Sequence, residues 1–128
     1  MTAENIKHHC MDAEWFDISE KTAIQINTAK TEGRRIIAVG TTAVRTLETS
    51  AFQQGIVQPG SGDTRLFITP GFEFKAVDAI LTNFHFPRTT LIMLVSAFAG
   101  RNRIRAAYQE AIKERYRFYS YGDVMFIE

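Results

Sequence analysis

A short apolar run followed directly by a glycine turn constrains the fold of this chain more than any other feature. Residues 35–39, Arg-Ile-Ile-Ala-Val, are rich in β-branched side chains and nearly all apolar, which predicts a strand covered on both faces. Residues 40–42, Gly-Thr-Thr, then turn the chain, and residues 43–54 predict a helix that ends at Gly55. Strand, turn and helix together form a βα unit, which favours an α/β fold.

Strands and helices also alternate on both sides of this unit. Ser19 is a predicted cap for a helix that runs to about residue 32 and ends at Gly33. Residues 55–63 contain three glycines and one proline, which predicts a loop. The other expected elements are a short apolar entry at 15–18, strands at 64–69, 77–84, 117–121 and 124–127, a helix from Thr89 or Thr90 to Gly100, and a helix at 102–116 capped by Asn102. This order predicts a mixed or largely parallel sheet with helices on its faces.

Composition places the chain among ordinary globular proteins. Its 128 residues are 45% apolar and 23% charged, which suits one folded domain. A single cysteine rules out an internal disulfide and favours a reducing, cytoplasmic environment. The longest apolar run, residues 91–99, is too short to cross a bilayer, so no membrane association is expected. Basic residues exceed acidic ones only in the second half, which is compatible with a nucleic-acid partner.

The glycine turn is the first candidate for chemistry. Backbone N–H groups of Gly40, Thr41 and Thr42 would face a ligand at the start of a helix, where the two hydroxyls add donors. Arg45 follows one turn later and could bind a carboxylate. A purely structural alternative is a threonine N-cap with Arg45 paired to Glu48.

The end of the predicted strand at 77–84 is the second candidate. His85 at its carboxyl end is able to move protons near neutral pH, and Asp78 upstream could orient the imidazole or act as a base. Asn83 and Phe84 could hydrogen-bond to and stack on a purine-like ring. The structural alternative is a hydrogen-bonded histidine before a trans-proline turn, with an aspartate that caps a neighbouring turn.

Two further groups of residues favour ordinary roles. Adjacent histidines in a strand point to opposite faces, so the polar residues near the start do not predict a metal site: His8, His9, Cys10, Asp12 and Glu14. Six basic residues surround the last predicted helix and are typical of a solvated face: Arg101, Arg103, Arg105, Lys113, Arg115 and Arg117.

Three long motifs carry a resemblance to a known family. They are GTTAVRTLE at 40–48, LFITPGFEFKAVDAILTNFHFPRTTLIMLVSAFAG at 66–100 and YRFYSYGDVM at 116–125. In this order they closely resemble the S-adenosylmethionine:tRNA ribosyltransferase-isomerase family of queuosine biosynthesis. The likeness runs from about His9 to Ile127.

The resemblance implies an activity, a donor and a partner. Such an enzyme transfers the ribosyl part of S-adenosylmethionine to 7-aminomethyl-7-deazaguanine at the tRNA wobble position and isomerises it, which gives epoxyqueuosine. S-adenosylmethionine is consumed as the ribosyl donor, and no metal is expected. The partner is a tRNA that carries the modified base, and the setting is the cytoplasm.

The resemblance also implies an architecture. Family members have an α/β domain with a smaller inserted β-barrel, and residues 1–128 match the carboxy-terminal part of that domain, without the barrel. Family enzymes are often monomeric. A sheet cut from a larger domain presents an unpaired edge, however, so self-association and loss of independent activity are expected for this chain alone.

The candidate residues match family motifs position by position, and the roles expected of them follow from side-chain chemistry. The residues expected to hold the methionine or ribose end of the donor form the glycine turn: Gly40, Thr41, Thr42 and Arg45. The residues expected near the substrate are Asp78 and His85 for proton transfer, and Asn83, Phe84, Arg117 and Asp123 for binding. Asp12 stands where the family commonly has the second histidine of a His-x-Met-His-x-Glu motif, so no role carries over to that position.

Other classes of function stay open from the sequence. The match covers less than half of a family member, so the chain could be a truncated non-catalytic fragment or a small-ligand binding module. A pure RNA-binding domain fits less well, because the chain has no RNP-type motif and little excess positive charge.

Overall fold

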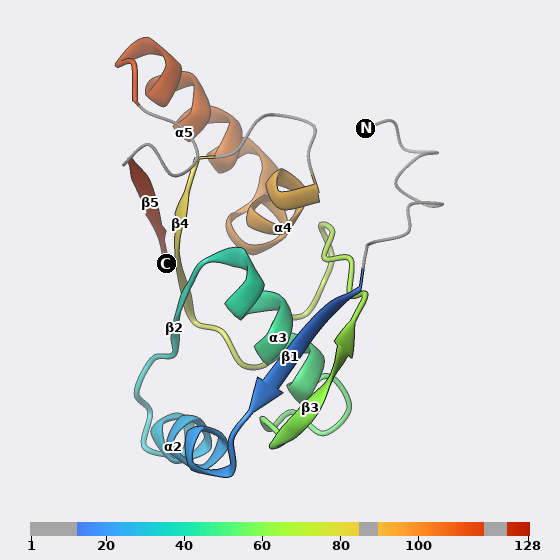
Figure 1. Cartoon of the computed structure of the whole chain (residues 1–128). Coiled ribbons are helices and arrows are strands. Elements are labelled where there is room, and N and C mark those ends of the chain that lie inside the picture. The colour runs from blue at the N-terminus through green and yellow to red at the C-terminus, as the bar shows by residue number, and fades with distance from the viewer. Residues whose placement is uncertain (1–12, 85–89, 117–122) are drawn as a thin grey trace.

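Two small sheets organise the part of the chain that the computed structural model describes, residues 13–84, 90–116 and 123–128 (Figure 1). The elements follow in the order β1 (Glu14–Ile18), α2 (Glu20–Thr31), β2 (Ile37–Val39), α3 (Thr41–Ala51), β3 (Gly60–Thr64), β4 (Ala79–Asn83), α4 (Thr90–Ala99), α5 (Arg101–Lys113) and β5 (Val124–Ile127). The expected strand at 117–121 and the possible cap at Thr89 lie outside the described residues.

The larger sheet has the strand order β2-β4-β5 and is mixed. β2 runs parallel to β4, with Ala38 beside Ile80, and β5 runs antiparallel to β4, with Met125 beside Thr82. Side chains from α3, α4 and α5 pack on the face that carries Ala38, Ile80 and Met125. This arrangement confirms the predicted α/β class with a mixed sheet.

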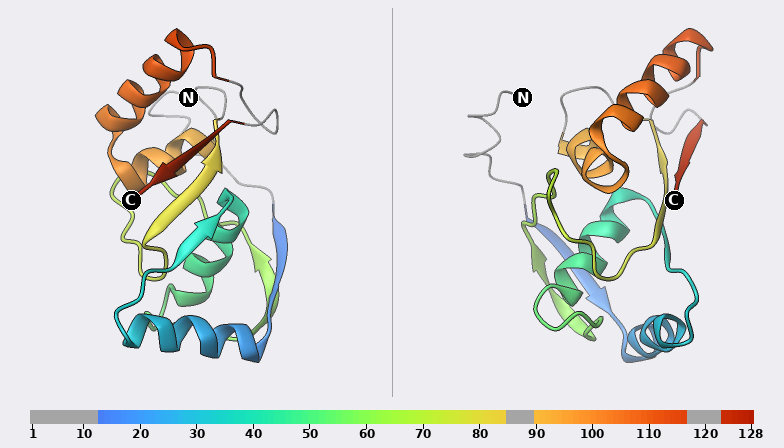
Figure 2. Two further views of the ribbon diagram at one scale, coloured as in Figure 1. Left: turned by 90° about the vertical axis from the view of Figure 1, so that its left-hand side faces the viewer. Right: turned by 180° about the vertical axis from the view of Figure 1, so that it is seen from behind.

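No helix of the described residues covers the opposite face of the larger sheet. The left view of Figure 2 looks onto these strands, with α3 and α4 behind them and α5 above. Ile37 is 46% exposed and Val39 69% exposed, and Val124 and Phe126 on β5 are also about half exposed. The prediction that β2 is covered on both faces is therefore wrong, because the described helices pack on one face of the sheet only.

The smaller sheet pairs β1 with β3, antiparallel, from Glu14 opposite Thr64 to Ile18 opposite Gly60. The predicted loop at 55–63 is correct only up to residue 59, and the predicted strand at 64–69 is wrong except at Thr64, because the strand lies earlier, at Gly60–Thr64. Its sequence, GSGDT, has low intrinsic β-propensity, so its strand conformation depends on backbone pairing with β1. The Phe16 ring covers the facing Gly62.

The helix ends were predicted correctly for α2 but not for α5 or for the end of α3. The Ser19 side chain caps α2 by accepting the N–H of Thr22 at 3.1 Å, and Gly33 follows with a φ of +77°. Asn102 does not cap α5, because Gly100 precedes the helix with a φ of +97° and Arg101 is already helical. α3 ends at Ala51, before the predicted end at residue 54.

One face of α5 packs into the core. Ile104, Tyr108 and Ala111 are buried beneath the larger sheet, whereas Ile112 is 63% exposed. None of the helices in the described part of the chain is both long enough and apolar enough to cross a membrane.

Candidate functional site

The glycine turn lies where β2 ends and α3 begins. Gly40 donates its N–H to the carbonyl of Leu81 on β4 at 2.8 Å, so the turn adjoins the carboxyl ends of both parallel strands. Its φ of +90° is in a region that non-glycine residues rarely adopt. Gly40 is the N-cap and α3 has no side-chain cap, so the alternative of a threonine N-cap is wrong. Thr41 is half-buried and Thr42 is exposed.

Arg45 lies one turn into α3 and is only 4% exposed. Its Nε donates to the carbonyl of Leu66 at 3.0 Å and its Nη2 to the carbonyl of Thr64 at 3.4 Å. Its Nη1 forms an ion pair with Glu14, which replaces the predicted pair with Glu48. Burial lowers the pKa of the Arg45 guanidinium, although a guanidinium stays protonated at neutral pH. With these three contacts, every nitrogen of the Arg45 guanidinium has a partner within the protein.

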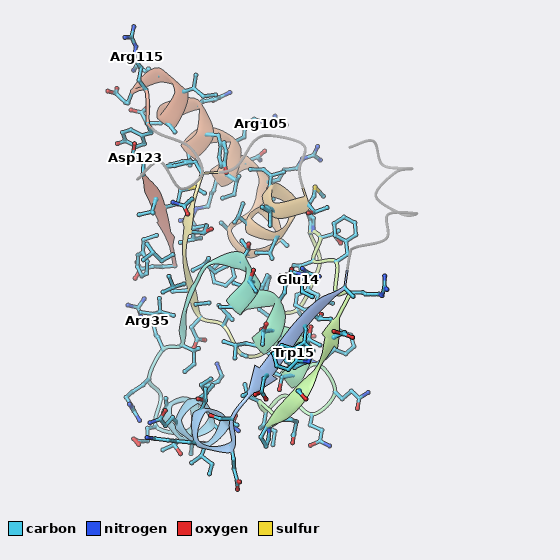
Figure 3. All side chains as sticks on the ribbon, in the orientation of Figure 1. Glu14, Trp15, Arg35, Arg105, Arg115 and Asp123 are labelled. Atoms are coloured by element: carbon cyan, nitrogen blue, oxygen red, sulfur yellow. The ribbon has the colours of Figure 1, made fainter. Side chains whose placement is uncertain are left out.

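Glu14 is the residue of this site that the sequence did not predict. It begins β1, beside α3, and is labelled in Figure 3. One carboxylate oxygen pairs with Arg45, and the other accepts the Thr42 hydroxyl at 3.4 Å. The side chain of Glu14 keeps 41% of its surface exposed. The signal in the sequence was the glutamate of the family motif, but its partner is 31 residues away.

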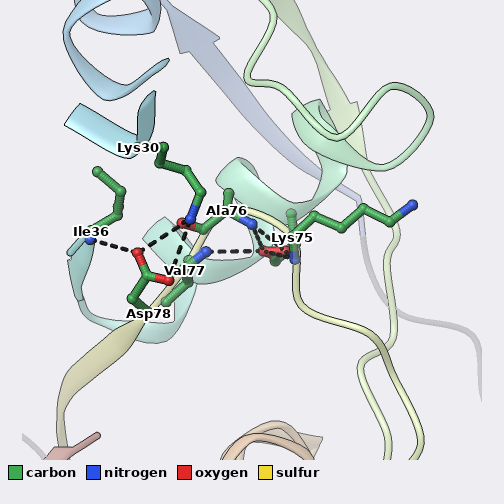
Figure 4. A network of polar contacts seen from close by, with 7 residues as sticks. Lys30, Ile36, Lys75, Ala76, Val77 and Asp78 are labelled. Carbon is green, nitrogen blue, oxygen red and sulfur yellow. Dashed lines mark hydrogen bonds and ion pairs between the residues drawn. The ribbon is translucent and has the colours of Figure 1, made fainter. Parts of the chain in front are cut away.

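Glu48, which is on α3, has a different role: it holds the loop that leads into β4. Its side chain is 1% exposed, and its carboxylate accepts the N–H groups of Lys75 at 2.6 Å, Ala76 at 2.9 Å and Val77 at 3.3 Å. Figure 4 shows these three N–H groups converging from one stretch of backbone. A carboxylate with several N–H donors is well stabilised when it is buried.

Asp78 lies at the amino end of β4, away from the glycine turn. Its carboxylate accepts the N–H of Ile36 at 2.8 Å and forms an ion pair with Lys30 at 3.2 Å (Figure 4). Asn83 is at the other end of the strand, about 16 Å away at 3.3 Å per residue. The structure therefore separates Asp78 from the other described candidates and engages it in holding β2 beside β4.

The carboxyl end of β4 brings Asn83 and Asp123 together. The Asn83 side-chain amide donates to the backbone carbonyl of Asp123 at 3.3 Å. Phe84 follows, but it is 3% exposed, and its ring packs against Tyr108 with centroids 5.4 Å apart and against Tyr116 at 5.9 Å. The structure thus encloses this ring in the core and does not present it to a base.

Several predicted site residues lie outside the described part of the chain: His85, Arg117 and the group at His8, His9, Cys10 and Asp12. Their roles stay predictions. Within residues 13–84, 90–116 and 123–128, no three His, Cys, Asp or Glu side chains come together as a metal ligand set.

A hollow of about 430 Å³ adjoins the first turns of α3. It lies between that helix, the end of β1 and the start of α2, and its polar lining comes from Asp17, Ser19, Thr22 and Thr46. The site thus combines a glycine turn at strand ends, an exposed carboxylate on a buried guanidinium, and a recess with several hydroxyl groups.

The fold is that of an α/β protein, a class in which ligands commonly bind where parallel strands end. The family model described as queuosine biosynthesis protein matches residues 1–127, and the chain belongs to this family.

Proteins similar to this chain are known from several bacteria. A protein of Natranaerobius thermophilus named S-adenosylmethionine:tRNA ribosyltransferase-isomerase is 62% identical over 124 residues, which are 97% of this chain and 36% of that protein. One of the same name from Herminiimonas arsenicoxydans is 58% identical over the same shares. The chain thus spans 36% of the length of these relatives.

A solved structure shows the same fold. The S-adenosylmethionine tRNA ribosyltransferase of Thermotoga maritima is 50% identical and superposes with a TM-score of 0.83, over 89% of this chain and 40% of that one. The α/β arrangement described above is therefore shared with an experimentally determined relative.

Proposed function

We propose that this chain forms the donor-binding part of an S-adenosylmethionine-dependent tRNA ribosyltransferase-isomerase. The whole enzyme would transfer the ribosyl moiety of S-adenosylmethionine to 7-aminomethyl-7-deazaguanine at the tRNA wobble position and isomerise it to epoxyqueuosine. The observation that carries the proposal is the 62% identity, over 97% of this chain, to a protein of that name. Residues 1–128 would form the carboxy-terminal part of its α/β domain.

The glycine turn is the proposed donor site. Gly40, Thr41 and Thr42 lie where parallel strands end, the usual place for a ligand in an open α/β sheet. The adjoining hollow offers room for an uncharged part of the donor. Arg45 contributes through Glu14, because its own nitrogens are engaged.

Proton transfer is assigned to His85. The reaction needs a base to remove a proton beside the sulfonium and an acid to assist the departure of adenine. Asp78 was expected to share this work, but its carboxylate is held by Lys30 and Ile36 at the far end of β4. We therefore assign Asp78 to structural support of the sheet.

The carboxyl end of β4 is the proposed tRNA side of the site. Asn83 and Asp123 lie together there, and Arg117 is assigned to the same substrate-binding group. Phe84 would support this edge from the core, because its ring is buried. The target base must leave its stack to react, as in other enzymes that modify a base. The enzyme would work on tRNA in the cytoplasm, with no metal.

A chimeric enzyme tests the proposal. This chain would replace the matched 124 residues of the Natranaerobius thermophilus relative, and the tRNA product would be analysed by mass spectrometry. We expect release of adenine and formation of epoxyqueuosine, and loss of both in a His85→Ala variant. A folded chimera that forms no product, beside an active parent enzyme, would contradict the proposal.

A binding module without turnover is the second candidate, because the chain covers only 36% of its relatives. Calorimetric titration of the 128-residue chain with S-adenosylmethionine, after circular dichroism confirms folding, separates the two. Binding by a chain whose chimera shows no turnover would favour the module.

A further inference from the structure

In the ion pair beside the glycine turn, the carboxylate of Glu14 is the more exposed charge. Arg45 was expected to bind a carboxylate of the ligand, but a carboxylate of the protein, that of Glu14, already occupies the guanidinium. The same carboxylate accepts the hydroxyl of Thr42, the exposed threonine of the turn. The arrangement therefore reverses the polarity that the sequence predicts for this site.

Burial decides which member of the ion pair a ligand meets. The Arg45 side chain is 5% exposed, whereas that of Glu14 is 41% exposed. The other donors of the guanidinium are directed inward to the carbonyls of Leu66 and Thr64. Although the pair is neutral as a whole, its negative end faces outward, so a ligand that approaches from solvent meets the carboxylate first.

A carboxylate offers about four lone-pair sites. Among the described residues, Arg45 and Thr42 each take one such site on Glu14. These two contacts fix both oxygens in place without covering the side chain. Such a pre-oriented, partly exposed carboxylate is suited to a positively charged group of the ligand.

We propose that Glu14 recognises the sulfonium of the donor, and that Arg45 and Thr42 are the positioning residues for its carboxylate. This inference rests on the proposed function, in which the turn binds S-adenosylmethionine. The sulfonium is a permanent positive charge attached directly to the ribosyl group that is transferred. A carboxylate beside it attracts the charged donor and discriminates against the neutral thioether that lacks the S-methyl group.

The test compares two ligands that differ at sulfur. S-adenosylmethionine carries the sulfonium, whereas S-adenosylhomocysteine has a neutral thioether and the same amino acid and nucleoside groups. Dissociation constants of both would be measured by calorimetry on the chimeric enzyme and on its Glu14→Gln variant. Glutamine keeps the size of the side chain and an oxygen for Arg45, but it removes the charge.

We expect Glu14→Gln to weaken binding of S-adenosylmethionine about tenfold and to leave that of S-adenosylhomocysteine unchanged, as the loss of one partly screened charge pair predicts. Unchanged binding of the thioether also shows that the variant is folded. Glu14→Asp should restore part of the preference. The matched control is Glu110→Gln, which removes the same charge from the exposed face of α5 and should leave both constants unchanged.

The two ideas fail in different ways. If Glu14→Gln weakens the binding of both ligands equally, or of neither, sulfonium recognition is wrong and the donor site still stands. Failure of the unmodified chimera to bind either ligand would contradict the donor site itself, and sulfonium recognition with it.

Discussion

The Glu48 carboxylate accepts the backbone N–H of Ala76, 28 residues further along the chain, at 2.9 Å. Together with the N–H groups of Lys75 and Val77, this contact fixes the loop just before β4 and thereby the position of β4 beside β2. A buried carboxylate at the centre of the βα unit thus replaces hydrogen bonds that a strand or helix would otherwise supply.

Replacing Glu48 should destabilise the protein strongly. Glu48→Gln turns one acceptor oxygen into a donor that faces N–H groups, so at least one buried N–H loses its partner. We expect the free energy of unfolding to fall by about 2–3 kcal/mol, the usual cost of such an unsatisfied group. Urea denaturation measures it, with Glu110→Gln as the surface control. A change below about 0.5 kcal/mol, as for an ordinary surface substitution, would contradict the role assigned to Glu48.

Asp78 should matter for stability more than for the donor site. Asp78→Asn keeps an oxygen for the N–H of Ile36 but removes the charge opposite Lys30, in an ion pair that is about one-third exposed. The expected loss is therefore small, about 0.5–1 kcal/mol in thermal unfolding. Affinity for S-adenosylmethionine and turnover of the chimera should persist. Abolished turnover in a variant of normal stability would restore Asp78 to proton transfer.

Substitution of Gly40 should destabilise the protein because of the backbone conformation at this position and not because of crowding. No atom lies within 4 Å of a Cβ added there, but the φ is +90°. We expect Gly40→Ala to cost about 1–3 kcal/mol of strain, measured by thermal unfolding.

Gly62→Ala is the comparison for Gly40→Ala. Its added Cβ would make only ordinary contact with the Phe16 ring, at 3.6 Å, and no positive φ is required there. It should therefore be tolerated. Equal effects of the two substitutions would argue against backbone strain at Gly40.

The Ser19 cap should be worth about 1 kcal/mol, as for other N-caps. Ser19→Ala removes the acceptor for the N–H of Thr22, and helix α2 should fray at its start. Hydrogen exchange of the first amides of α2 would detect this, and Ser19→Asp should reverse the effect. Protection that is unchanged in the alanine variant would mean that packing alone holds the first turn.

The sequence predicted those features whose causes are close together along the chain. Ser19 and Gly33 bound α2 as expected, since a cap and a left-handed stop act within a few residues. Strand β3 was missed because Gly60–Thr64 takes its conformation from pairing with β1, more than 40 residues earlier. Local propensity contains no information on that partner.

The sequence predicted where the candidate site lies, but not the sign of the charge that it exposes. The glycine turn is where the βα pattern placed it, at Gly40. The polarity of the site depends on Glu14, which belongs to the smaller sheet and forms an ion pair with Arg45 on α3. Phe84 was misjudged for a similar reason, because α5 supplies the Tyr108 ring that helps to enclose it. In each case the decisive neighbour is distant in sequence.

The bare face of the larger sheet has a practical consequence for anyone who handles this chain. On this face of the native protein, four apolar side chains are between 46% and 69% exposed: Ile37, Val39, Val124 and Phe126. Dyes such as ANS, which fluoresce on apolar surface and are commonly read as signs of misfolding, should therefore light up with correctly folded material. Strong dye fluorescence at the start of a melting curve would then come from the native state. Thermal unfolding should therefore be followed by circular dichroism instead.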